Sequence, residues 1–204
     1  MTLIVDKISI ELVMTCAVMM AMRLIDMLKS TDRVARREAE AALEAMGSEA
    51  IESLAVAMRS DDPGQAWRAA RLLAKIEDPR RTFYMEQALA STNGLVGQVA
   101  VKAIVDTLSP SQAGDILTKN LLTSAPIVQI HMVAALSLLG HREAIGNLVV
   151  LLETSVAAEV RYSTIEALGL LHATQAADVI RSFADDGNHH VRERVQTALQ
   201  LLVT

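Results

Sequence analysis

Aromatic residues are nearly missing from this sequence of 204 residues, in which Phe, Trp and Tyr together make up 2%. Glycines number 9 and prolines 4, too few for an all-β protein with many tight turns. They are also too few for a disordered or collagen-like chain. Because 51% of the residues are hydrophobic, a core has to be built from Ala, Leu, Val, Ile and Met. This composition favours helices.

The sequence also has a single cysteine and no excess of basic residues. The one cysteine, Cys16, excludes an internal disulfide and fits a reducing compartment. The net charge is −5, with 19 Lys and Arg against 24 Asp and Glu, so a bulk basic surface for nucleic acid or anionic lipid is absent. The apolar stretch over residues 12–22 is too short to span a membrane. We therefore expect a cytoplasmic protein that makes no membrane contact.

What the sequence does contain is an internal repeat. Similar strings rich in Ala and Leu recur along the chain, and their anchors are spaced 30, 32, 31, 32 and 31 residues apart. The neighbouring columns at offsets of −8, −4, −1 and +3 are mostly apolar, which is the pattern of one helix stripe. The anchors are Leu43, Leu73, Val105, Leu136, Leu168 and Leu199.

A second helix precedes each anchored helix. Leu24, Leu54, Leu148 and Ile180 lie 19 or 20 residues before the next anchor, so each repeat is predicted to be a helical hairpin of about 31 residues. Such a hairpin cannot bury its apolar stripe alone, so neighbouring hairpins have to stack. Gly47 and Gly140 follow predicted helices, where a left-handed cap is wanted.

The residues that open the later helices resemble a known family. Val160-Arg161 and Val191-Arg192 open helices that continue to Ala167-Leu168 and Ala198-Leu199. This pattern is similar to the HEAT repeat, in the short form of the phycobilisome-lyase-like group. The resemblance implies an all-α fold, a right-handed α-solenoid of about six HEAT-like hairpins over residues 17–203. Residues 1–16 are then an N-terminal capping or association segment.

In the resembled family, the helix-opening arginine and an aspartate in the preceding loop tie adjacent repeats together. Arg36, Arg161 and Arg192 occupy the arginine position here, whereas Gln98 and Gln129 replace it in the third and fourth repeats. The resemblance therefore implies a structural role for the arginines and a ladder that is incomplete in the middle of the chain.

The family resemblance also implies that the second helix of each hairpin lines a concave surface. Its exposed rows, read from the repeat register, are charged at the ends of the chain and apolar in the middle. An apolar strip with a charged rim marks a binding surface, and Trp, Tyr and Arg are its common anchors. The predicted binding residues are Trp67, Arg68, Arg71, Val99, Ile130, His131, Val133, Tyr162, Ile165 and Glu166.

Two structural alternatives stay open. In a tightly curved solenoid, the apolar rows pack against the next helix instead of a partner. The first 29 residues hold six of the ten methionines, and an adaptable Met-rich surface serves either as a buried cap or in self-association, such as a homodimer.

Motifs for chemistry are not found. No histidine forms the His-Glu pair of metal-binding hydroxylases or a zinc-protease motif, and His189-His190 is assigned to a solvated turn before Val191. Gly94-Leu95-Val96-Gly97 lacks the continuation of a phosphate-binding loop. We expect no catalytic residue, no metal and no cofactor.

The sequence thus predicts a non-enzymatic scaffold that binds a protein or peptide on its concave face. Two alternatives are a bilin or other chromophore lyase-like subunit, and a nucleic-acid-binding HEAT-like protein. The second is disfavoured by the net negative charge, although arginines cluster at Arg33, Arg36 and Arg37.

Overall fold

The computed structural model describes residues 16–203, and these residues form helices, turns and bends without a strand among them. The chain divides into two compact units, Met1–Ala88 and Leu89–Thr204. The all-α prediction is therefore confirmed for the described part of the chain.

The first unit is built from helical hairpins. Residues 16–27 are helical and lead into α2, and α2 packs against α4. The short helix η1 contacts α2 and α3, α3 packs with α4, and α5 contacts both α3 and α4. The elements of this unit are α2 (Arg33–Met46), η1 (Gly47–Ala50), α3 (Ile51–Ala57), α4 (Pro63–Lys75) and α5 (Arg80–Ala88).

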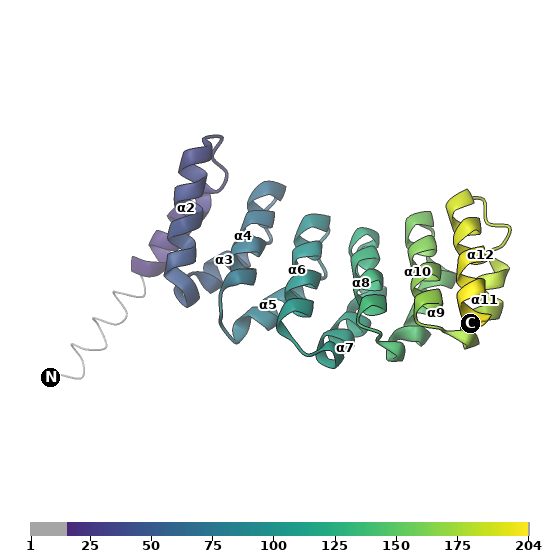
Figure 1. The fold of residues 1–204 in the computed structure, drawn as a ribbon. Coiled ribbons are helices and arrows are strands. Elements are labelled where there is room, and N and C mark those ends of the chain that lie inside the picture. Colours follow the sequence, from purple (N-terminus) through teal and green to yellow (C-terminus); the bar gives the residue numbers. More distant parts are fainter. Residues whose placement is uncertain (1–15, 204) are drawn as a thin grey trace. The chain divides into compact units, whose positions relative to one another are not determined.

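The second unit arranges its helices in two layers. Helices α6, α8, α10 and α12 lie side by side in chain order, and α7, α9 and α11 form the other layer (Figure 1). Its helices are α6 (Gly94–Thr107), α7 (Pro110–Asn120), α8 (Pro126–Leu138), α9 (Ile145–Thr154), α10 (Ala158–Leu170), α11 (Ala177–Ser182) and α12 (His189–Val203). Short 3-10 turns join some of them: η2 (Leu121–Thr123), η3 (Arg142–Ala144) and η4 (Thr174–Ala176).

The predicted period governs where the helices begin. The second helices start at residues 33, 63, 94, 126, 158 and 189, which are steps of 30, 31, 32, 32 and 31. Polar caps and prolines set several of these starts: the Asp62 side chain accepts a hydrogen bond from the amide of Gln65, and Pro63 follows it. The anchors Leu43, Leu73, Leu136 and Leu168 are fully buried. The repeat prediction is confirmed.

Three of the second helices, α2, α8 and α10, are followed by a residue with left-handed backbone. Gly47 has a φ of 55° and Gly140 a φ of 63°, as expected for glycine caps. After α10 the same left-handed position is taken by His172, with a φ of 49°. Its imidazole lies 3.0 Å, Nδ1 to oxygen, from the carbonyl of Leu201, so a contact to α12 accompanies the unusual residue.

The helix-opening side chains hold the loops between the paired helices. Arg36 donates to the carbonyls of Ser30 and Thr31 within its own hairpin. Arg192 likewise donates to the backbone carbonyl of Asp186. At the equivalent position, Gln129 donates to the carbonyl of Leu121, so this replacement of arginine keeps a bond to the loop.

Among the helix-opening arginines, Arg161 also bonds to the next repeat. It donates to the carbonyls of Ser155 and Val156 in its own loop. It also donates through two nitrogens to the carboxylate of Asp186 in the loop of the next hairpin. The tie between adjacent repeats that the family resemblance implies is thus made at this position.

The N-terminal segment predicted over residues 1–16 lies outside the described residues, apart from Cys16, which is exposed. The helix that follows it packs through Ala21, Ile25 and Leu28 and leaves Met19, Met20 and Met22 exposed. Within residues 16–203, no helix has both the length and the apolar composition that crossing a membrane requires.

Candidate protein-binding surface

Three side chains of the predicted surface recur at one register position in the second unit. Val99 on α6, Ile130 on α8 and Tyr162 on α10 each lie six residues before an anchor, and each is partly exposed. Because α8 packs against both α6 and α10, these side chains belong to one helix layer. The layer therefore presents apolar side chains to the surface at three consecutive repeats.

Four further apolar side chains extend this layer, and the sequence analysis missed them. They are exposed at the two ends of the same helices: Leu95, Ile127, Leu138 and Leu170. Leu138 and Leu170 both lie two residues after an anchor, so the repeat register held a signal for them. Exposed large aliphatic side chains on successive helices are typical of an interaction surface.

Two residues predicted for the surface lie in the core instead. Val133 is 1% exposed and Ile165 is 0% exposed. Both lie three residues before an anchor, a row that packs between neighbouring helices because α8, α10 and α12 are in direct contact. For this row the alternative of a tightly packed solenoid holds, and neither side chain can meet a partner directly.

The polar members of the predicted surface differ in their surroundings. His131 on α8 is partly buried, and desolvation lowers its pKa, so its imidazole is neutral at pH 7. Glu166 on α10 forms an ion pair with Arg194 on α12, with 3.4 Å between Oε1 and Nη1. His131, Glu166 and Arg194 therefore make this part of the layer polar, and the carboxylate of Glu166 is paired.

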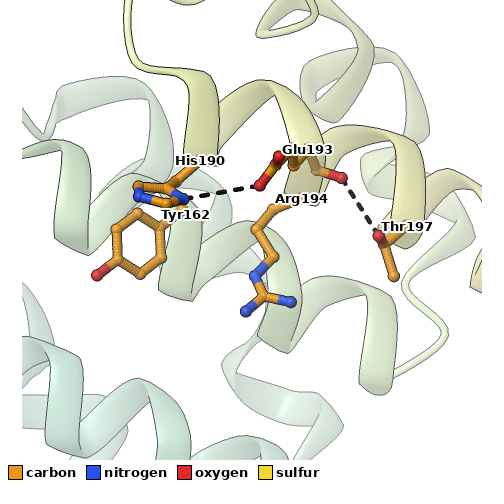
Figure 2. Close-up of a pocket in the computed structure, with 5 residues that line it drawn as sticks. All are labelled: Tyr162, His190, Glu193, Arg194 and Thr197. Atoms are coloured by element: carbon orange, nitrogen blue, oxygen red, sulfur yellow. Dashed lines mark hydrogen bonds and ion pairs between the residues drawn. The ribbon is translucent and has the colours of Figure 1, made fainter.

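A shallow pocket of about 500 Å³ opens between α10 and α12, where Tyr162 faces the first turns of α12. Figure 2 shows the five side chains that line it: Tyr162, His190, Glu193, Arg194 and Thr197. The rings of Tyr162 and His190 meet edge to face, with centroids 6.0 Å apart. Nδ1 of His190 lies 3.6 Å from a carboxylate oxygen of Glu193.

The sequence analysis assigned His189 and His190 to a turn, whereas α12 begins at His189. The amide of His190 donates to the side chain of Asn188, which caps this helix. His190 therefore has a fixed place in the first helical turn, beside Tyr162. The pocket therefore combines an aromatic ring with side chains of both charge signs.

In the first unit, the predicted residues on α4 form a second surface. The guanidinium carbon of Arg71 lies 4.7 Å from the ring centroid of Trp67, a cation–π contact one helical turn apart. Arg68 pairs with Glu40 of α2 at 3.9 Å, and Lys75 pairs with Glu44 at 2.7 Å. Trp67 is partly exposed and Arg71 exposed, so both are accessible.

Side chains of the metal-ligating types do not cluster in the part of the chain that the structure covers. Among residues 16–203, no three His, Cys, Asp or Glu side chains gather so that they could hold a metal ion. The arrangement that remains on the second helices is one of apolar, aromatic and ion-paired side chains, which suits binding.

Comparisons with known proteins bear on the fold. No curated protein matches the chain in sequence. An engineered protein solved by the Northeast Structural Genomics Consortium is 22% identical, with a TM-score of 0.50, and the match covers 90% of this chain and 96% of that one. A second engineered protein from the same consortium matches with the same identity and TM-score, over 90% of this chain and 58% of its own length.

A designed armadillo repeat protein is 18% identical with a TM-score of 0.48, and covers 89% of this chain and 99% of its own. The family model that matches describes HEAT repeats and spans residues 114–200. Nothing in these matches bears on the narrower resemblance to the phycobilisome-lyase-like group. The HEAT-repeat model thus matches the part of the chain that runs from within α7 to within α12, and the same kind of helical hairpin recurs from residue 16 onward.

Proposed function

We propose that this chain is a non-enzymatic interaction module that binds a protein or peptide on the layer of second helices. The observation that carries the proposal is the apolar row Val99, Ile130 and Tyr162, which three neighbouring helices hold at the surface. A water-exposed row of this kind is costly for a protein without a partner to cover it. We propose this layer as the concave face that the family resemblance implies.

The mechanism is burial of an apolar segment or helix of the partner on that row. Ile130 lies in the middle of the row, where surrounding contacts exclude water best, so it and Tyr162 are the expected hot spots. The Glu166–Arg194 pair and the pocket beside Tyr162 then orient polar groups of the partner at the C-terminal end. A cytoplasmic location is part of this proposal, because Cys16 is the one cysteine of the chain.

The experiment is a tagged capture from native host lysate, read by quantitative mass spectrometry, with two matched variants. Ile130→Glu places a charge in the apolar row, whereas Val150→Glu places the same charge on an exposed valine of α9 in the other layer. We expect a protein that wild type and Val150→Glu capture equally and that Ile130→Glu captures at least tenfold less.

Thermal melting by circular dichroism establishes that both variants are folded before the comparison. Equal capture by all three proteins would overturn the placement of the surface on this layer. If Ile130→Glu leaves capture unchanged and Val150→Glu abolishes it, the interface lies on the layer of first helices instead.

A further inference from the structure

The first unit holds a guanidinium that is oriented but lacks an acidic partner. Arg71 lies on the Trp67 ring, as described above, and its side chain is exposed. Among residues 16–203, no carboxylate forms an ion pair with it. The guanidinium therefore lies over the face of the Trp67 ring, with N–H groups available to donate to a ligand.

The carboxylates near Arg71 already form ion pairs with other side chains. Glu40 and Glu44, the two carboxylates that α2 directs toward α4, are paired with Arg68 and Lys75. Arg68 lies three residues before Arg71 and Lys75 four residues after it, so the two ion pairs flank Arg71 along α4. The arrangement leaves one uncompensated positive charge between two neutralised ones.

The apolar surface beside this charge is the Trp67 ring. A tryptophan that is partly exposed and held by a neighbouring arginine offers a flat apolar contact next to paired N–H donors. Trp and Arg are also the residues most enriched among binding hot spots. The combination fits a carboxylate that is carried next to an apolar side chain.

We infer that Trp67 and Arg71 form a receptor for an acidic side chain, Asp or Glu, within an apolar segment of a protein partner. The inference rests on the proposed interaction function and names the partner chemistry at α4. The carboxylate accepts two hydrogen bonds from the guanidinium edge, and the adjacent apolar side chain packs on the Trp67 ring.

A polyanion fits this surface less well than a single carboxylate. Nucleic acids bind through many phosphate contacts, each of which needs a lysine or arginine. Two of the three cations along this face of α4 are paired with Glu40 and Glu44, which leaves a single cation available to an anion. The charge balance therefore favours an acidic protein segment.

The test uses the fluorescence of Trp67, which is the single tryptophan of the chain and so reports on this site alone. The probes are two blocked hexapeptides added to the full-length protein, acetyl-LEELLE-amide and acetyl-LKKLLK-amide. We expect a saturable change in Trp67 emission with the glutamate peptide, and at least tenfold weaker binding of the lysine peptide.

Three variants separate recognition from folding. Arg71→Gln should weaken the binding of the glutamate peptide about tenfold. Arg71→Lys should bind it with an affinity between those of wild type and Arg71→Gln, because lysine keeps the charge but not the planar pair of donors. Arg59→Gln, at an exposed arginine in the turn after α3 of the same unit, should bind like wild type. Equal binding by Arg71→Gln, or no emission change with folded wild type, overturns the inference.

A single-stranded DNA oligonucleotide serves as the third probe. If it binds more tightly than the glutamate peptide and loses affinity steeply with salt, the site is a phosphate site and the carboxylate inference is wrong. Because the proposed function is tested at Ile130 in the other unit, the failure of one result is distinguishable from the failure of the other.

Discussion

Arg161 binds the carboxylate of Asp186 with two parallel hydrogen bonds, Nε to Oδ2 at 2.9 Å and Nη2 to Oδ1 at 3.0 Å. The two residues come from consecutive hairpins, 25 positions apart in the sequence. Their side chains are only 16% and 9% exposed. This pair is therefore a shielded bond between repeats, unlike the solvated ion pairs elsewhere on the protein.

Removing one member of this pair should destabilise the second unit. We expect Arg161→Gln to lower the free energy of unfolding by about 2 kcal/mol, since a shielded carboxylate is left without its cation and two loop carbonyls lose a donor. Arg181→Gln removes an ion pair with Asp178 that is largely solvated, and should cost less than about 0.5 kcal/mol. Urea unfolding followed by circular dichroism measures both. Equal losses would contradict a special role for Arg161.

The same pair makes stability depend on acid. The hydrogen bonds from Arg161 hold the pKa of Asp186 below its ordinary value of 3.8. A carboxyl whose pKa is lower in the folded state stabilises the fold above its unfolded pKa, and this contribution is lost as the pH falls from 3.8 toward the folded pKa. Asp186→Asn should therefore be less stable than wild type near pH 7, and the difference should shrink near pH 3. Unfolding free energies at both pH values test this, and a constant difference would exclude linkage to Asp186.

Gly114 on α7 is required by a side chain that packs against it. A Cβ atom at this position would lie 2.3 Å from Nδ1 of His141, whose ring is buried and belongs to the next hairpin. Gly114→Ala should thus cost about 2 kcal/mol or more through overpacking. Gly146 on α9 has no atom within 4 Å of the same position, so Gly146→Ala should be neutral or stabilise by up to about 1 kcal/mol. Thermal melting curves of the two variants provide the comparison, and similar shifts in melting temperature would contradict the contact between Gly114 and His141.

Gly140 is required by its backbone rather than by a neighbour. Its φ is 63° and no atom lies within 4 Å of a Cβ built there, so Gly140→Ala is strained only through the left-handed conformation. We expect a loss of about 1 kcal/mol. Gly187→Ala, where space is also open and φ is not left-handed, is the matched control and should change stability by less than about 0.5 kcal/mol. Denaturant midpoints for the two variants provide the measurement.

The repeat could be predicted because its signal is local. Each second helix carries its own apolar stripe, so the register could be followed from Leu43 to Leu199 without knowing how helices pack. Gly140 was recognised as a left-handed cap because glycine is the usual residue there. His172 at the same position was not, since histidine carries no comparable backbone signal.

The binding residues were harder to predict because exposure depends on neighbours. Ile130 and Val133 are three residues apart on α8 and chemically alike, yet the first is partly exposed and the second is buried. Three residues along a helix rotate by about 300°, so the two side chains point only about 60° apart. The position of the adjacent helices therefore decides which of the two is covered. For the same reason His190, taken as a solvated turn residue, turned out to line the pocket with Tyr162.

The sequence by itself determined the helical class, the hairpin repeat of about 31 residues and the positions of most helix starts, because these follow from local periodicity and capping. Packing between helices decided which side chains of the second helices meet solvent and that the helix-opening Arg161 bonds to the next repeat. It also decided that Arg71 lies on Trp67 while the nearby carboxylates are paired with Arg68 and Lys75. Those features arise from distances between helices, which no single stretch of sequence specifies.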